Sequence, residues 1–133
     1  MDNSGITILN VDGSEVGLYA KSRILRESGY RVIEARTGAE ALRLASTSAP
    51  QLVLLTADLP DWSGFEALRR IKADTTLYSQ AAPPLVLLLS STFVGCENRA
   101  RALEVGADGY LLEPAAPEFL LRNIKMVLRQ CLD

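Results

Sequence analysis

The sequence predicts an α/β protein in which a five-stranded parallel sheet carries helices on both faces. Short apolar runs of strand length alternate with longer segments of helical periodicity, which is the pattern of successive strand–helix units. The run at 52–55 is apolar at consecutive positions, as expected for a parallel strand that is covered on both sides. A length of 133 residues suits one domain, so we expect a single unit over 1–133 with a core from about 6 to 131.

The first half of the chain contains three predicted strands with a helix after each of the first two. The strands are expected at 6–11, 30–35 and 52–55. Ser14 can cap the first helix, and Gly29 suits the left-handed conformation that often ends a helix. Thr37 and Glu40 form a capping box, which marks the start of the second helix.

The second half continues the alternation with three helices and two strands. A turn-rich loop at 58–64 leads into a helix whose apolar residues begin at Phe65. Strands are expected at 85–89 and 110–112, with a helix at about 97–105 between them. Pro117 starts the last helix, because the first turn tolerates a residue that has no backbone N–H.

Right-handed crossovers between five such strands favour the sheet order 2-1-3-4-5, the flavodoxin-like arrangement. In this arrangement the loops after strands 1, 3, 4 and 5 meet beside one another at the carboxyl edge of the sheet. The polar residues in those loops are therefore expected to form a crevice. They are Asp12, Gly13, Thr56, Asp58, Ser90 (with Ser91 as the alternative hydroxyl) and Glu113.

Composition excludes several classes of protein. The net charge is −2 and acidic and basic residues are interspersed, which argues against a nucleic-acid-binding surface. Histidine is absent, which removes the commonest general base and metal ligand, so we expect no enzyme. Cys96 and Cys131 match no metal or redox spacing. No apolar run approaches the roughly 18 residues of a membrane span, and we expect a cytoplasmic protein without membrane contact.

Three motifs in order resemble response regulator receiver domains, the CheY-like domains of bacterial two-component signalling and phosphorelays. Residues 8–12 (ILNVD) resemble their first strand and residues 54–66 (LLTADLPDWSGFE) their phosphorylation-site strand and loop. Residues 106–114 (GADGYLLEP) resemble their fifth strand with its terminal proline. The resemblance covers about residues 6 to 131, nearly the whole chain.

The resemblance also implies a chemistry. In receiver domains an aspartate at the end of the third strand accepts a phosphoryl group, and acidic residues after the first strand help it to hold Mg²⁺. A hydroxyl after the fourth strand and a lysine after the fifth bind the phosphoryl oxygens. Here Thr56 stands in place of the acceptor, Gly13 in place of the second acid, and Glu113 in place of the lysine. Asp12 and Ser90 remain.

These departures predict a degenerate receiver that lacks the phospho-acceptor. A neutral hydroxyl at Thr56 is a poor nucleophile without a base, and Glu113 brings negative charge where the phosphoryl group needs positive charge. We therefore expect a phosphorylation-independent protein-interaction module, a pseudo-receiver, either alone or within a larger sensor kinase or regulator. Its partner would be a histidine kinase, an output domain or a second copy. The face implied by the resemblance comprises Arg99, Leu103, Tyr110, Leu111, Leu112 and Ala115.

Some alternatives stay open. An active receiver could use a displaced acceptor, Asp58 or Asp61, and a flavodoxin-like binder of small molecules is disfavoured because the first loop lacks a phosphate cradle. No cofactor is expected beyond a residual Mg²⁺ site of Asp12 and Asp58, two acids that should converge with no lysine nearby. The bland expectations are that Asp12 bonds loop amides and that the Thr56 hydroxyl bonds a neighbouring backbone group.

Overall fold

The computed structural model describes residues 3, 5–73, 84–90 and 95–132. For 95–99 and 130–132 the description is limited to the backbone. Ser91 therefore lies outside the described residues, as do the side chains of Arg99, Cys96 and Cys131.

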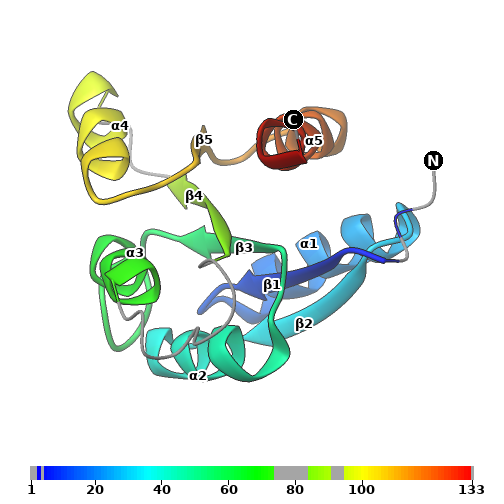
Figure 1. Cartoon of the computed structure of the whole chain (residues 1–133), viewed down its shortest axis with the longest axis horizontal. Helices are drawn as coiled ribbons and strands as arrows, with labels where there is room; N and C mark the ends of the chain where they lie inside the picture. The colour runs from blue at the N-terminus through cyan, green and yellow to red at the C-terminus, as the bar shows by residue number, and fades with distance from the viewer. Residues whose placement is uncertain (1–2, 4, 74–83, 91–94, 133) are drawn as a thin grey trace.

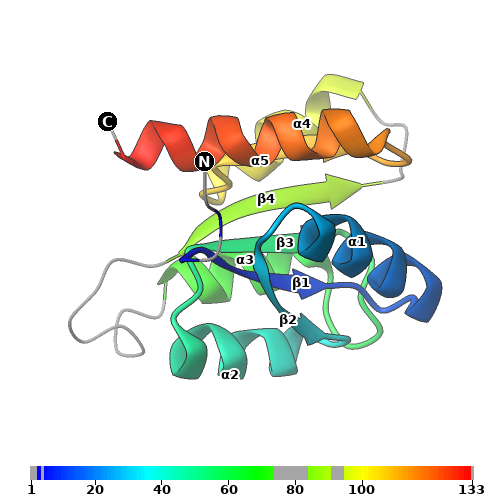
Figure 2. The same cartoon turned by 90° about the vertical axis from the view of Figure 1, so that its right-hand side faces the viewer.

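The described residues form five strands that pair in parallel in the order β2-β1-β3-β4-β5. This confirms the predicted fold class and sheet order. Figure 2 shows the strand arrowheads directed toward the same edge of the sheet, which is where the predicted crevice residues follow their strands. The strands are β1 (Thr7–Val11), β2 (Arg31–Ala35), β3 (Leu52–Thr56), β4 (Leu85–Ser90) and β5 (Gly109–Leu112).

The helices cover both faces of this sheet (Figure 1). They are α1 (Glu15–Glu27), α2 (Gly38–Ser48), α3 (Gly64–Ala73), α4 (Gly95–Glu104) and α5 (Pro117–Leu132). Helices α1 and α5 pack on one face through Leu25, Leu120 and Ile124, where they meet Ile8 of β1. Helices α2, α3 and α4 enclose a second apolar cluster on the opposite face. The sheet is thus buried on both sides, which accounts for its consecutive apolar residues.

The local signals in the sequence act as predicted. The Ser14 hydroxyl accepts from the Gly17 N–H at 3.3 Å, and the Thr37 hydroxyl accepts from the Glu40 N–H at 3.1 Å. Gly29 follows α1 with φ of +93°, the left-handed conformation. Pro117 is the first residue of α5, and α4 begins at Gly95, two residues before the predicted start.

The two outer strands of the sheet are β2 and β5. Along β2, the charged residues Arg31 and Glu34 are exposed, whereas Ala35 at its carboxyl end is buried. Strand β5 has only 4 residues. The central position belongs to β3, whose 5 residues are all buried, so Thr56 at its end is positioned by the most enclosed strand.

Within the described part of the chain, every helix is too short or too polar to cross a membrane.

Candidate functional site

A cavity of about 420 Å³ lies at the carboxyl edge of the sheet, between the loops that follow β1, β3 and β5. It brings together four predicted site residues: Asp12, Thr56, Asp58 and Glu113. Ser90 is buried at the end of β4, and the Glu113 N–H donates to its carbonyl at 2.9 Å. The full lining is Asp12, Ser14, Gly17, Thr56, Ala57, Asp58, Leu89, Glu113 and Pro114.

Thr56 is the last residue of β3 and lies beside Leu89 of β4. Its side chain is buried, and its hydroxyl donates to the Val11 carbonyl of β1 at 3.3 Å. This confirms the expectation that the hydroxyl bonds a neighbouring backbone group. The side chain therefore ties β3 to β1 at the floor of the cavity and presents no carboxylate to it.

Asp12 follows β1 and is buried, so its carboxylate needs partners. One oxygen, Oδ1, accepts from the Ser14 N–H at 2.9 Å, which confirms the expected bond to a loop amide. The other oxygen, Oδ2, lies 3.0 Å from the ammonium nitrogen of Lys21. Both oxygens of Asp12 are thus engaged by groups of this chain.

Lys21 is the functional residue that sequence reasoning missed. Its ammonium is buried, lies 3.8 Å from Glu113 Oε2 as well as close to Asp12, and has no N–H aligned for a hydrogen bond. The prediction that no lysine lies near Asp12 is wrong, because α1 folds back over the sheet. A signal existed: Leu18, Lys21 and Leu25 share the helical spacing of a buried face.

Two glycines shape the surroundings of Asp12. A side chain at Gly17 would collide with Asp12 Oδ2, so glycine there allows the carboxylate to lie against α1. A Cβ at Gly13 would lie 2.9 Å from Pro60 Cδ. An acidic residue at position 13 would therefore have to displace Pro60 before it could join the pocket.

A buried asparagine connects β1 to α1. Asn10 of β1 donates through Nδ2 to the Leu18 carbonyl at 3.1 Å and to the Ser22 hydroxyl at 3.0 Å. These two hydrogen bonds join α1 to β1, although Asn10 Oδ1 itself has no hydrogen-bond partner among the described residues.

The two alternative acceptors lie in different places. Asp58 is exposed in the loop after β3 and lines the cavity. Asp61 instead caps α2: its carboxylate accepts from Gly38 N at 2.8 Å, Ala39 N at 3.0 Å and Trp62 N at 2.9 Å. Partial desolvation raises the pKa of Asp61, but these hydrogen bonds together outweigh it and hold the pKa below its ordinary value.

The described residues do not fit a Mg²⁺ site. They contain no group of three or more side chains of metal-ligating type placed to hold an ion. Mg²⁺ needs oxygen ligands in near-octahedral geometry at roughly 2.0–2.1 Å. Asp12 and Asp58 do line one cavity, but Asp12 already contacts Ser14 and Lys21. The contacts of Asp12 therefore oppose the residual cation site.

The residues of the predicted partner face differ in exposure. Leu103 of α4 and Leu112 of β5 are exposed apolar residues. Tyr110 and Ala115 are half-buried and pack against the two apolar clusters. Leu111 was wrongly assigned to the face: it is 4% exposed, because alternate residues of β5 point to opposite sides and Leu111 points beneath α5.

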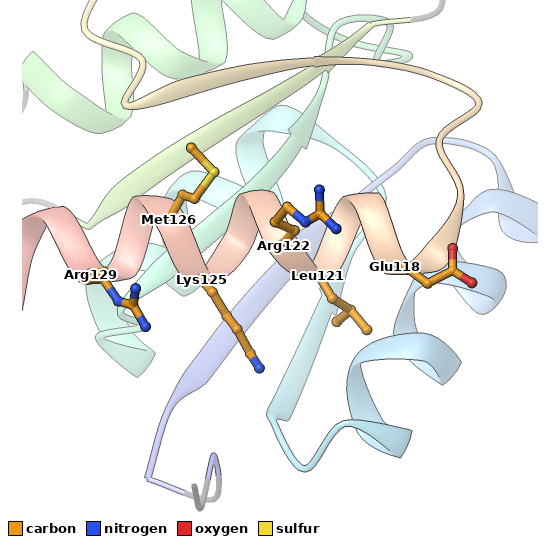
Figure 3. Close-up of a pocket in the computed structure, with 6 residues that line it drawn as sticks. All are labelled: Glu118, Leu121, Arg122, Lys125, Met126 and Arg129. Atoms are coloured by element: carbon orange, nitrogen blue, oxygen red, sulfur yellow. The ribbon is translucent and has the colours of Figure 1, made fainter.

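Helix α5 extends the exposed surface. Phe119 and Met126 are about half exposed, at 49% and 54%. Six residues of this helix line a shallow hollow of about 470 Å³, and Figure 3 shows their side chains along the helix. They are Glu118, Leu121, Arg122, Lys125, Met126 and Arg129.

A family model and several curated proteins match most of this chain in sequence. The family model described as "Response regulator receiver domain" matches residues 8–125. The phosphate regulon transcriptional regulatory protein PhoB of Pseudomonas aeruginosa is 35% identical over 127 residues, a match that covers 95% of this chain and 53% of PhoB. The chain spans about half the length of such curated relatives.

Solved structures of receiver domains have the same fold as this chain. A CheY-like response regulator receiver domain protein from Methanospirillum hungatei has a TM-score of 0.80 at 29% identity, with 94% of each chain covered. The receiver domain of a signal transduction histidine kinase from Syntrophus aciditrophicus has a TM-score of 0.79 at 28% identity, with 93% of this chain and 90% of that chain covered.

Proposed function

Because the chain belongs to the response regulator receiver domain family, we propose that it is a two-component receiver that works as a phosphorylation-independent interaction module. The observation that carries this proposal is Thr56 at the end of β3, the position that the family resemblance assigns to the acceptor aspartate. Its hydroxyl is bonded to the Val11 carbonyl, and no histidine exists in the chain to activate it. The pseudo-receiver thus keeps the fold of a receiver without its acceptor.

The charges around the cavity support the same proposal. Asp12, Asp58 and Glu113 line it, so an incoming phosphoryl group would meet three carboxylates. Lys21 offsets part of this charge, but its ammonium is buried between Asp12 and Glu113. A phosphoryl donor would therefore approach a region of predominantly negative charge, which disfavours its binding.

The partner in this proposal is a protein. Four of the large exposed apolar residues belong to α4, β5 and α5, the elements labelled in Figure 1, and they are Leu103, Leu112, Phe119 and Met126; Val16 and Tyr19 of α1 are exposed as well. A histidine kinase, an output domain or a second copy is the class of partner we propose. The unit is 1–133, acting alone or within a larger regulator or sensor kinase in the cytoplasm, without direct contact to nucleic acid and without enzyme activity of its own.

Phosphoryl transfer tests the proposal. The protein is incubated with acetyl phosphate and Mg²⁺ beside a phosphorylatable receiver, and intact masses are compared. We expect an unmodified mass for this chain and an added phosphoryl group on the control. A base-labile addition on a carboxylate would overturn the proposal, whereas an acid-stable addition at Thr56 would indicate a different phosphorylation chemistry.

One observation favours a second candidate, an active receiver with a displaced acceptor. Asp58 is exposed and lines the cavity, within the same hollow as Asp12. Asp61 receives no such support, since three backbone N–H groups already occupy its carboxylate. If the mass increases, Asp58→Asn should abolish the addition under this alternative, and Asp61→Asn should leave it in place.

A further inference from the structure

We infer that the Lys21 ammonium is a built-in counter-cation, which balances Asp12 and Glu113 in this pocket and excludes divalent cations from it. The inference deepens the proposed function and rests on it, since it explains how a receiver pocket without a phosphorylation cycle keeps its shape. It concerns a residue on α1, outside the motifs that carry the family resemblance.

The contacts of Lys21 carry the inference. Its Nζ lies 3.0 Å from Asp12 Oδ2 and 3.8 Å from Glu113 Oε2, so one cation joins the loop after β1 to the end of β5. The side chain of Lys21 is 7% exposed and that of Asp12 is 11% exposed. Water therefore screens this pair little, and each charge depends on the other for its stability.

The backbone around the pair is adapted to it. Gly17 leaves room for Asp12 Oδ2 on the side that faces α1, and any larger residue there would occupy this space. Lys21 lies one turn further along the same helix, on its buried face between Leu18 and Leu25. Asp12 is thus turned toward Lys21 by the packing of α1.

Exclusion of a divalent cation follows from position and charge. A metal ion that used Asp12 would have to approach Oδ2, where the ammonium already lies, or Oδ1, which accepts from Ser14 N. It would also lie within a few ångströms of a buried positive charge, which is strongly unfavourable at low dielectric. Removal of the Lys21 charge should allow a divalent cation to bind, because Asp12, Asp58 and Glu113 would then surround the cavity without a counter-ion.

A magnesium titration of wild type and Lys21→Met tests this. Methionine keeps most of the length of the lysine side chain and removes its charge. By amide NMR, we expect no saturable shift at Asp12, Thr56 or Glu113 in wild type, and saturable shifts at all three in Lys21→Met. We also expect Mg²⁺ to raise the melting temperature of Lys21→Met alone. Lys72→Met is the matched control. Lys72 Nζ lies 2.7 Å from Asp108 Oδ2, and neither residue lines the cavity, so this variant should show no Mg²⁺ response.

Each outcome decides the matter. Saturable Mg²⁺ shifts at Asp12 in wild type would overturn the inference, as would a Lys21→Met variant that shows no response. A Lys21→Met variant that folds only with Mg²⁺ would support it, and one that stays unfolded at every Mg²⁺ concentration would contradict it. The failure of this inference can be distinguished from the failure of the proposed function. If wild type binds Mg²⁺ but gains no phosphoryl label, only the counter-cation role of Lys21 is overturned. If a carboxylate of wild type gains the label, the proposed function is overturned.

Discussion

At the residue scale, the ion pair between Asp12 and Lys21 carries a large energetic consequence. Both side chains are almost fully buried, so either charge left alone would lack both water and a counter-charge. Glu113 lies 3.8 Å from Lys21 and is partly exposed, which makes it an incomplete substitute for Asp12. The stability of the domain should therefore depend strongly on this pair.

Asp12→Ala should lower the free energy of unfolding by about 3 to 5 kcal/mol, the typical cost of breaking a buried ion pair. Urea denaturation followed by circular dichroism measures the change. Arg23→Ala is the matched control, because Arg23 forms an exposed ion pair with Glu27 on the outer side of the same helix. That variant should show no measurable change; equal losses in both variants would contradict the importance of burial.

Thr56→Val tests the structural role of the threonine hydroxyl. Valine has nearly the same shape but cannot donate to the Val11 carbonyl, so we expect a loss of about 1 kcal/mol in the free energy of unfolding. Thr47→Val, which removes an exposed hydroxyl bonded to Arg43 O, should change stability far less. Wild-type stability in Thr56→Val would show that the Thr56–Val11 bond is dispensable.

At the scale of elements, the loop between β3 and α3 fastens the start of α2. Asp61 accepts from the first two N–H groups of α2, Gly38 and Ala39. The Arg70 guanidinium lies 4.2 Å from the centroid of the Trp62 ring, which holds this loop against α3. Arg70 also donates a hydrogen bond to Glu66. The pKa of Glu66 is lowered to about 2, chiefly by the hydrogen bond from Arg69 and next by the one from Arg70.

Asp61→Ala should destabilise the fold by about 1 kcal/mol at neutral pH, as for loss of a helix cap. The pKa of Asp61 is lowered in the folded state, so its contribution is present above the ordinary value of 3.8 and is lost as pH falls through the folded value. Urea denaturation of wild type and variant at pH 7 and near pH 3 should show the difference shrink in acid. A constant difference would mean that the carboxylate charge is unimportant.

Truncation of two neighbouring residues of β5 should change the free energy of unfolding by very different amounts. Leu111 packs in the core beneath α5, so Leu111→Ala should cost about 2 to 5 kcal/mol in unfolding free energy. Leu112 is 43% exposed, so Leu112→Ala should change stability by no more than about 0.5 kcal/mol. Chemical denaturation of the two variants side by side measures both; similar losses would contradict the assigned alternation of the strand.

Particular elements show what sequence reasoning could and could not reach. The caps at Ser14 and Thr37 were predictable because their partners lie three residues away. The role of Asp61 was not, because its partner Gly38 lies 23 residues away along the chain. For Leu111, a strand of only 4 residues gives too short an alternation to identify its buried side.

The candidate site divides in the same way. Strand order alone predicted that Asp12, Thr56, Asp58 and Glu113 would meet at one cavity, because parallel strands end at the same edge. Lys21 was missed because lysine is normally an exposed residue. Only its helical spacing from the buried Leu18 and Leu25 indicates that it lies on the buried face of α1.

At the scale of the whole molecule, the proposed pseudo-receiver differs from the family pattern at three positions of the pocket, so a single substitution should restore phosphorylation only slowly. Thr56→Asp supplies the carboxylate but leaves Glu113 and Gly13 in place. The triple variant Thr56→Asp, Gly13→Asp, Glu113→Lys supplies the charges that the resemblance assigns to family members. Both variants are made in the Lys21→Met background, so that the inferred counter-cation does not exclude Mg²⁺. We expect it to gain the acetyl phosphate label at least about tenfold faster than Thr56→Asp, a difference of roughly 1.4 kcal/mol in activation free energy.

Intact-mass time courses with Mg²⁺ compare these variants. The aspartate introduced at position 13 of the triple variant must also displace Pro60, so the melting temperature of this variant should fall below that of Thr56→Asp. Equal labelling rates in the two variants would mean that the acceptor alone limits the chemistry. In that case the changes at positions 13 and 113 would have little bearing on phosphorylation.

The outer strands of the sheet have a consequence for assembly. An unpaired strand edge is a template for intermolecular β-pairing and aggregation, and charged or very short edge strands suppress it. Here β2 exposes Arg31 and Glu34, and β5 has only 4 residues. Extension of the sheet into a fibre is therefore disfavoured at both ends, which leaves the helix surfaces as the route to specific association.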